Sequence, residues 1–359
     1  MKYELWLSSL TVMSHQKKRK LKEMYKKAEV LYYIEERELS RHDFLSKKDI
    51  DNIVASKTRW NIAKEYQKIQ LLNIRLITWK SKEYPQKLEN IADPPYALFV
   101  RGRLPNPNKF AASIVGARRC TPYGAAMARK IAEELASNDV EIISGMAKGI
   151  DAIAARGALN GEGSSYAVLG SGIDVCYPNE NKGLYNDLQK QGGIISELPL
   201  ASAPLRHHFP ARNRIISALA DLVLVIEAKA RSGSLITAEM ALEQGKEIYA
   251  LPGPVTSELS KGCNCLISQG AQILIGIEEL LDDITTNYKY QMSRKEKSIN
   301  KLSDEERKVY GYFNSYPVNL ENLIRRVDLT ISELLGVIVE LELKGYIEEI
   351  SKNYYVRCR

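Results

Sequence analysis

Residues 111–281 alternate between short apolar runs and amphipathic segments, and this alternation restricts the possible folds of the chain more than any other feature. Segments 123–136 and 235–244, for example, have helical periodicity and lie between apolar runs. Strands that are apolar throughout and separated by helices are typical of a mostly parallel sheet covered on both faces. We therefore predict an α/β fold with a Rossmann-like, doubly wound sheet. Its predicted strands are 111–115, 140–143, 165–169, 193–196, 222–226, 247–251 and 272–275.

The region before this sheet is expected to be mainly helical. Apolar side chains recur there at spacings of three and four residues with lysines on the other side, and no glycine occurs before Gly102. The pattern changes near Arg75, which begins a strand-like run, and a second short strand is expected at 96–100. We predict an N-terminal helical domain over residues 1–74 and a Rossmann-like domain with an N-terminal extension over residues 75–284.

The C-terminal part has the pattern of a separate small domain. Residues 285–300 are polar and charged, and we predict a linker there. Beyond it, capping boxes that begin at Ser303 and Thr330 each predict a helix start. Gly345 suits the left-handed position that ends the second of these helices, and a hairpin pattern follows it. Three helices and a hairpin predict a winged-helix domain over residues 301–359.

The charge is unevenly distributed along the chain. The formal net charge is +7, and residues 1–90 hold 20 Lys+Arg and 12 Asp+Glu, so the rest of the chain is nearly neutral. The total indicates an anionic partner but does not locate its site.

Several classes of protein are disfavoured by what the sequence lacks. No apolar run reaches the 18 or more residues of a membrane span, and no apolar signal core follows the N-terminus, so we expect a cytoplasmic protein. Five cysteines without Cys-x-x-Cys spacing favour neither disulfides nor zinc. The dinucleotide fingerprint, the P-loop and the common hydrolase signatures are missing. We expect no metal and no cofactor.

The ends of five predicted strands carry glycines, small polar residues or basic residues. In an open parallel sheet, ligands bind beyond the carboxyl ends of the strands. Glycine lets the backbone approach an anion closely, and free N–H groups at a helix start favour negative charge. These ends therefore predict a phosphate-binding site. The candidate residues are Arg118, Arg119, Ser144, Gly145, Lys148, Arg231, Ser232, Gly233 and Ser234.

Residues 205–216 concentrate arginines and histidines around one aromatic side chain, just before an apolar strand. Phe209 precedes Pro210, which favours an extended backbone that could hold the ring outward. Arginine beside an exposed aromatic ring suits single-stranded nucleic acid, because the cation contacts phosphate while the ring stacks on a base. The alternative is that Phe209 belongs to the core and the arginines cover a helix N-terminus.

With these motifs the chain resembles the DNA processing protein A family, also called DprA or Smf. The matching runs are 115–118, 144–151, 168–174, 177–178, 196–197, 209–214, 232–238 and 252–253. The resemblance covers roughly residues 75–281, and the flanking regions fit the family by position and shape. It implies a binding protein rather than an enzyme, which binds single-stranded DNA, dimerises and helps to load the RecA recombinase during natural transformation.

The resemblance also implies which residues bind DNA. Arg118, Lys148, Arg206, Phe209, Arg212 and Arg214 would form the pocket, and Ser144, Gly145, Ser232, Gly233 and Ser234 would supply backbone and hydroxyl donors. With the neighbouring Arg119 and Asn213, these are the candidate DNA-binding residues.

Two other functions stay open at this point. One is a phosphoribohydrolase-like enzyme, because Ser232-Gly233-Ser234 with Glu239 superficially resembles the glycine-rich loop and glutamate of such enzymes. The other is a transcription regulator that uses the winged helix. The predicted second helix of that domain carries three glutamates and a single cation, Lys344, whereas a face that binds duplex phosphates should be basic. We therefore expect the winged helix to contact protein, either RecA or another copy of the chain, or merely to stabilise the protein.

Overall fold

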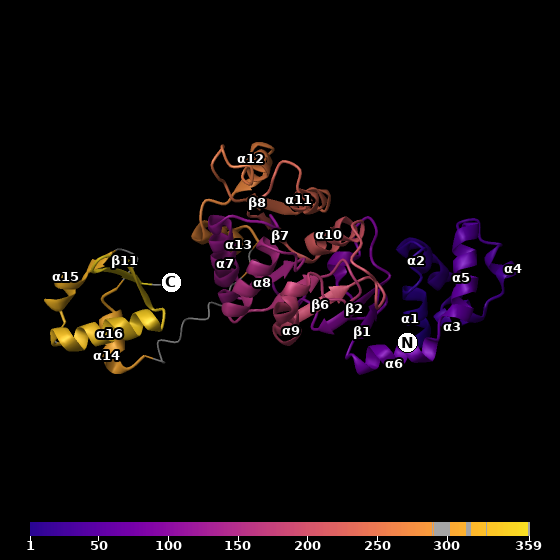
Figure 1. The fold of residues 1–359 in the computed structure, drawn as a ribbon, viewed down its shortest axis with the longest axis horizontal. Helices are drawn as coiled ribbons and strands as arrows, with labels where there is room; N and C mark the ends of the chain where they lie inside the picture. Colours follow the sequence, from indigo (N-terminus) through magenta and orange to yellow (C-terminus); the bar gives the residue numbers. More distant parts are fainter. Residues whose placement is uncertain (289, 291–301, 314–316, 328, 358–359) are drawn as a thin grey trace. The chain divides into compact units, whose positions relative to one another are not determined.

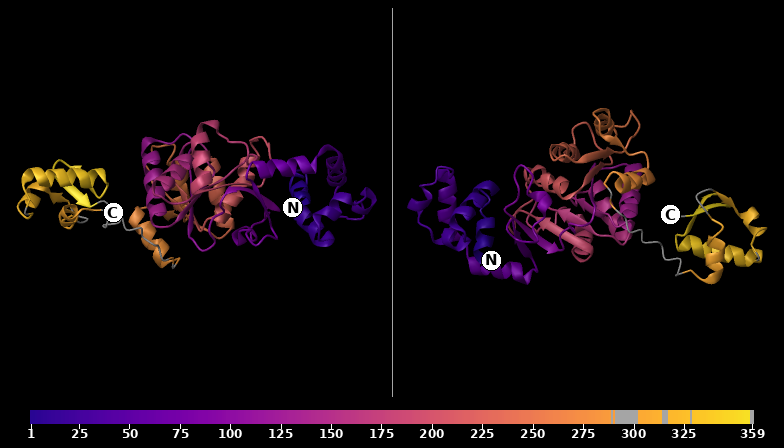
Figure 2. Two further views of the ribbon diagram at one scale, coloured as in Figure 1. Left: turned by 90° about the horizontal axis from the view of Figure 1, so that it is seen from below. Right: turned by 180° about the vertical axis from the view of Figure 1, so that it is seen from behind.

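The computed structural model describes residues 1–288, 290, 302–313, 317–327 and 329–357 (Figures 1 and 2). The chain forms two compact units, Met1–Ser293 and Arg294–Arg359. The first contains the N-terminal helices and the large sheet, and the second contains the C-terminal helices and hairpin. The predicted linker falls mostly outside the described residues, although Thr285 and Thr286 lie in a helix.

A nine-stranded, mostly parallel sheet forms the centre of the first unit. Seven neighbouring strands, from β6 to β9, are parallel, and β1 and β2 are added antiparallel at one side. The spatial order is β1-β2-β6-β5-β4-β3-β7-β8-β9. The strands are β1 (Arg75–Thr78), β2 (Ala97–Gly102), β3 (Ala111–Val115), β4 (Glu141–Ser144), β5 (Ser165–Val168), β6 (Gly192–Ser196), β7 (Leu222–Val225), β8 (Glu247–Ala250) and β9 (Gln272–Ile273). The predicted fold class is confirmed, because the chain proceeds from β3 to β6 on one side and then returns to place β7 on the other side of β3.

Helices cover both faces of this sheet, and the strands β3 to β7 are buried on both sides. In β3, Ala112 and Ile114 belong to one apolar cluster, whereas Ala111 and Val115 belong to the other. This alternation follows from the two-residue period of a strand. The helices of this region are α7 (Pro122–Ser137), α8 (Ile150–Asn160), α9 (Lys182–Gln191), α10 (His208–Leu219), α11 (Gly233–Glu243), α12 (Lys261–Ser268) and α13 (Ile277–Thr286).

The start of α10 differs from the sequence prediction. We expected an extended backbone at Phe209, but α10 begins at His208 and includes both Phe209 and Pro210. A proline in the first turn of a helix removes no intrahelical hydrogen bond, because the first N–H groups have no partner within the helix. The basic segment is therefore mostly helical, and the faces of α10 decide where its side chains lie.

The N-terminal helices share a buried apolar cluster with the side of the sheet that β1 and β2 form (Figure 1). Leu5 and Trp6 belong to the same buried cluster as Tyr96 and Phe99, which flank or lie in β2. The predicted boundary at residue 74 stays a prediction, and residues on its two sides bury each other. The helices are α1 (Lys2–Ser8), α2 (His15–Tyr25), α3 (Ala28–Tyr33), α4 (Glu36–Leu39), α5 (Lys47–Arg59) and α6 (Ile62–Leu71), with a 3-10 turn η1 at Gln86–Leu88.

The second unit is a winged helix, as predicted. Both capping boxes form, at Ser303 and at Thr330, and Gly345 has a positive φ of 69° after the second of these helices. The elements are α14 (Asp304–Tyr310), β10 (Val318–Asn319), α15 (Leu320–Ile324), α16 (Ile331–Leu343), β11 (Ile347–Ser351) and β12 (Tyr354–Arg357). The strands form a small sheet in the order β10-β12-β11.

Candidate functional site

A pocket opens at the carboxyl ends of three adjacent strands, β3, β4 and β5. It encloses about 420 Å³ including its open mouth. The first turn of α10 and the segment that follows β5 complete its wall. The lining residues are Arg118, Gly145, Ala147, Lys148, Gly170, Ser171, Tyr177, Pro178, Phe209 and Arg212. The sequence predicted a site at this edge of the sheet, and five of its candidate residues line the pocket.

Three cations from three different elements meet in the pocket. Arg118 follows β3 and Lys148 follows β4, and both side chains are exposed. Lys148 forms an ion pair with Glu180 in which each side chain is about half exposed. Exposed pairs of this kind contribute little stability, so a phosphate group could replace Glu180 at low cost. Arg212, in contrast, comes from α10 and is only 5% exposed.

The Arg212 guanidinium is held from within the protein. Its Nη1 donates to the carbonyl oxygen of Gly145 at 2.9 Å and also to that of Val168. Burial lowers the pKa of Arg212 to about 10, although the nearby Asp151 carboxylate raises it. Arg212 therefore remains charged at neutral pH, and it supplies a fixed positive charge to the pocket. Its Nε has no hydrogen-bond partner among the residues that the structure describes.

Two glycines let the loop after β4 pack closely. A Cβ atom at Gly145 would lie 2.4 Å from Nη1 of Arg212. Gly149 has a φ of +75°, and a Cβ atom there would lie 2.3 Å from the carbonyl oxygen of Ala117. Only glycine avoids both contacts without a shift of the loop. The glycines thus bring the β4 loop against Arg212 on one side and against the β3 loop on the other.

Two backbone donors of this loop, on Gly145 and Ile150, are used inside the protein. The N–H of Gly145 donates to the Asp151 carboxylate at 3.1 Å, and the N–H of Ile150 donates to the Ala117 carbonyl at 3.2 Å. Ser144 is fully buried. Neither Ser144 nor Gly145 therefore presents the expected donor to a ligand. The positive potential of the pocket comes from its side chains instead.

Two aromatic rings lie beside these cations. The ring centroid of Phe209 is 5.6 Å from the guanidinium carbon of Arg118 and 5.6 Å from the ring centroid of Tyr177. Tyr177 lies in one of the runs that resemble the family, but it is not among the site residues predicted from the sequence. Its position after the glycine-rich end of β5 was the available signal, since the sequence places that end at the same edge as the other loops.

Several predicted residues lie outside the pocket lining. Arg119 and Arg206 are exposed, and they lie close in sequence to the lining residues Arg118 and Phe209. Asn213 is buried and donates to the Gly233 carbonyl at 3.2 Å, so it joins α10 to the start of α11. Ser232 caps α11 by accepting from the N–H of Ser234. Asn213, Ser232 and Ser234 thus hold the starts of α10 and α11 in place, and none of the three is among the pocket-lining residues named above.

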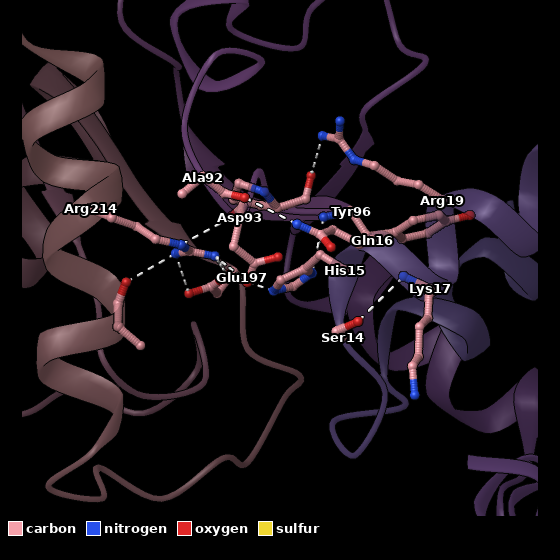
Figure 3. Close-up of polar contacts among 12 residues, drawn as sticks. Ser14, His15, Gln16, Lys17, Arg19, Ala92, Asp93, Tyr96, Glu197 and Arg214 are labelled. Carbon is pink, nitrogen blue, oxygen red and sulfur yellow. Dashed lines mark hydrogen bonds and ion pairs between the residues drawn. The ribbon is translucent and has the colours of Figure 1, made fainter. Parts of the chain in front are cut away.

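Arg214 lies in a buried ion pair away from the pocket, which corrects its predicted place (Figure 3). It donates to both oxygens of Glu197, and its Nε donates to the Asp93 carbonyl at 3.0 Å. His15, at the start of α2, reaches the same carboxylate with an Nε2–Oε2 distance of 2.8 Å. Burial would raise the pKa of Glu197, but the hydrogen bond from His15 and the charge of Arg214 lower it to about 2. This network joins α10 to the N-terminal helices.

The described residues contain neither a cluster of metal-ligating side chains nor a helix that could cross a membrane. No group of three or more His, Cys, Asp or Glu side chains within the described part of the chain could hold a metal ion. Among the same residues, no helix combines the length and the apolar character needed to span a membrane.

Two family models match the chain. The one described as DNA recombination-mediator protein A matches residues 75–285. The one described as DprA winged helix domain matches residues 293–351. Together they extend over the sheet and over most of the C-terminal unit.

Known proteins are similar over most of the chain. Protein Smf of Escherichia coli strain K12 is 39% identical over 295 residues, which are 80% of this chain and 78% of that protein. The DNA processing protein DprA of Streptococcus pneumoniae is 40% identical over 221 residues, which are 62% of this chain and 76% of that protein.

Two solved structures have the same fold. That of DNA processing protein A from Streptococcus pneumoniae matches with a TM-score of 0.66 and 32% identity, over 79% of this chain and 98% of the other. That of DNA processing protein A from Helicobacter pylori matches with a TM-score of 0.55 and 29% identity, over 60% of this chain and 96% of the other. The latter was solved to explain a single-stranded DNA binding mode.

Proposed function

The chain belongs to the DNA recombination-mediator protein A family, also named DprA or Smf, and from this premise we propose that it binds single-stranded DNA in the pocket of β3, β4 and β5. The observation that carries the proposal is the meeting of three cations, Arg118, Lys148 and Arg212, with aromatic rings in one pocket. Cations along a groove hold the phosphate backbone, and aromatic rings stack on bases of any sequence. The Helicobacter pylori relative is described as a protein that binds single-stranded DNA.

The cations divide into two roles. Arg118 and Lys148 are exposed, so they can form ion pairs with phosphates and release counterions. Arg212 is buried beneath the loop after β4 and is held there by hydrogen bonds, so its positive charge stays at the pocket. Arg119 and Arg206 are exposed and could extend the path of the strand. Three to five phosphate contacts would give log–log salt slopes of roughly −2 to −3.5, from about −0.7 per contact on a single strand.

The experiment is a salt titration of binding to single-stranded and duplex DNA of equal length. We expect the single strand to bind more tightly and Arg118→Ala to weaken binding and make the salt slope shallower by about 0.7. The matched control is Arg103→Ala. Arg103 is exposed as well, but its N–H donates to the Gly192 carbonyl, so it lies at the amino end of β6, the opposite edge of the sheet. Equal effects of the two substitutions, or a flat salt response, would contradict the proposal.

We further propose that the protein acts in the cytoplasm as a homodimer that loads the RecA recombinase on single-stranded DNA, in recombination and natural transformation. This rests on the family, whose description is that of a recombination mediator. With single-stranded DNA covered by a single-strand-binding protein, the full chain should shorten the delay before purified RecA forms filaments. Sedimentation of the full chain tests the dimer.

The winged helix has the character of a protein-binding module. The exposed face of α16 carries Ile331, Leu335, Val339 and Leu343, which are 40–83% exposed, and the helix contains no Lys or Arg. Duplex phosphates require a basic face. We propose that this face contacts RecA or another copy of the chain. Val339→Asp should then leave the affinity for single-stranded DNA unchanged while it slows RecA loading or weakens the dimer.

A further inference from the structure

Helix α10 serves the pocket with its first turns and is anchored away from the pocket by Arg214. Phe209 and Arg212 line the pocket, and Arg214 follows only two residues later. The Arg214 guanidinium donates to the carbonyl oxygen of Ala211, in the same helix, and to both oxygens of Glu197, which follows β6. Residues so close together on one helix move as a unit. The way in which Glu197 is held therefore affects where the pocket residues of α10 lie.

Glu197 is held from the N-terminal side by His15, the first residue of α2. Nδ1 of His15 accepts the N–H of Tyr96 at 3.1 Å, so Nε2 carries the hydrogen and donates to Oε2 of Glu197 at 2.8 Å (Figure 3). A buried carboxylate needs such donors in place of water. Glu197 therefore has one partner from the N-terminal helices and one, Arg214, from α10.

A second set of contacts joins α2 to α10 through residues 92–96, the segment that leads into β2. Gln16 of α2 donates from its side-chain amide to the Ala92 carbonyl at 3.1 Å. From the side of α10, the Nε of Arg214 donates to the Asp93 carbonyl at 3.0 Å. The structure describes all of residues 92–96, and they form neither a helix nor a strand, so side chains on both sides fix this segment (Figure 3).

We propose that His15 and Glu197 are positioning residues for DNA binding, which hold Arg214 and thereby keep Phe209 and Arg212 at the pocket. Both act through Arg214 and contact no DNA themselves. The proposal rests on the proposed function, because its readout is the affinity for a single strand. A binding group that is already held in place loses less freedom when the ligand arrives, so loosening α10 lowers the affinity. The N-terminal helices then contribute to DNA binding by preorganising α10.

The test measures binding of the full chain to a 20-mer of deoxythymidine by fluorescence anisotropy, at a temperature where urea denaturation shows each variant to be folded. His15→Ala and Glu197→Gln should each weaken binding about 2- to 30-fold, the range expected for substitutions in a coupling network. Neither should change the log–log salt slope, because no phosphate contact is lost. The double variant should lose less affinity than the two single losses combined, since His15 acts through Glu197.

The matched control is Asp49→Asn, which also changes a buried carboxylate into an amide. The Asp49 side chain is 4% exposed against 8% for Glu197, and it pairs with Lys17 within the N-terminal helices. Asp49→Asn should lower the free energy of unfolding but leave the affinity for the thymidine strand within about twofold. Equal losses of affinity in Asp49→Asn and Glu197→Gln would overturn the inference, because any loosening of the N-terminal helices would then suffice.

Other outcomes separate the inference from the proposed function. Unchanged affinity in both His15→Ala and Glu197→Gln would overturn the inference while the proposed function stands. A salt slope that becomes shallower by about 0.7 in either variant would reject it too, because that residue would then contact a phosphate directly. Failure of the unchanged protein to bind the strand would overturn the proposed function and the inference with it.

Hydrogen exchange provides a second measurement should Glu197→Gln fail to fold. His15 is 19% exposed, so His15→Ala disturbs the core less than a change at Glu197. Peptides that cover residues 208–214 should exchange their amide hydrogens faster in His15→Ala than in the unchanged protein, because the first turns of α10 open more often. Peptides that cover α7 should exchange equally in the two proteins. Equal exchange over residues 208–214 would reject the inference.

Discussion

Arg214 and Glu197 form a two-pronged ion pair inside the protein, with Nη1–Oε1 and Nη2–Oε2 distances of 2.9 and 2.7 Å. Their side chains are 13% and 8% exposed. The pair also involves His15, whose Nδ1 accepts the N–H of Tyr96, so Nε2 carries the proton that is donated to Glu197. The same helix, α10, carries Phe209 and Arg212 in the pocket. The N-terminal helices are thus connected to the helix that carries the proposed DNA site through a buried network of charged and polar side chains.

Arg214→Gln should destabilise the protein by about 3–5 kcal/mol, because it leaves the Glu197 carboxylate buried without its counter-charge. Urea denaturation of the full chain measures this loss. The double variant Glu197→Gln with Arg214→Gln should recover part of it, since neither buried charge then remains. Unchanged stability together with weaker DNA binding would show that Arg214 contacts DNA after all.

The Glu197 carboxylate should make the free energy of unfolding depend on pH. Its pKa is about 2 in the folded protein against an ordinary value of 4.5, so its ionised form is favoured by folding. A depressed carboxyl pKa contributes stability that is fully present above pH 4.5 and is lost as the pH falls towards 2. The contribution is on the order of 3 kcal/mol. Denaturation between pH 6 and pH 2 measures it, and Glu197→Gln should remove this part of the pH dependence. An identical pH profile in that variant would assign the acid sensitivity to other groups.

Gly145→Ala should weaken binding of single-stranded DNA, because the added methyl group would lie 2.4 Å from the Arg212 guanidinium and displace it or the loop. We expect at least a tenfold loss of affinity, together with reduced stability. Gly233→Ala is the matched control, since no atom outside its own neighbours lies within 4 Å of a Cβ at that position. It should leave both quantities within the range of a surface substitution, about 0.5 kcal/mol. Equal behaviour of the two variants would mean that the close packing on Arg212 does not matter for binding.

Glu180→Gln should strengthen binding of single-stranded DNA, by less than tenfold, because it frees Lys148 and removes a negative charge beside the pocket. Lys148→Ala should have the opposite effect and make the salt slope shallower by about 0.7. The effect of Glu180→Gln should become smaller in the background of Lys148→Ala, because the part that comes from freeing Lys148 is then absent. Fluorescence anisotropy with a labelled oligonucleotide measures all three variants, and additive effects would contradict the pairing.

Much of the fold follows from local patterns. The seven predicted strands of the parallel region all form, with ends that differ by at most two residues. Five of them, β3 to β7, are buried throughout, as expected for strands covered on both faces, whereas β9 has only two residues and both are exposed. The capping boxes at Ser303 and Thr330 form because their hydrogen bonds join residues only three positions apart. The carboxyl-end location of the pocket follows from the parallel order of the strands.

The different positions of the arginines within residues 205–216 could not be predicted in the same way. The residues of this segment were expected to act together on DNA, yet Arg212 lies under the pocket and Arg214 lies in the ion pair with Glu197. At 3.6 residues per turn, side chains two positions apart on a helix point about 200° away from each other. The sequence by itself therefore determined the strands, the helix caps and the edge of the sheet at which a ligand binds, since each depends on neighbours along the chain. Only the tertiary structure decided which arginine faces the pocket and that Tyr177 meets Phe209 there. These features depend on contacts between residues about 30 or more positions apart, and on which side of α10 the sheet covers.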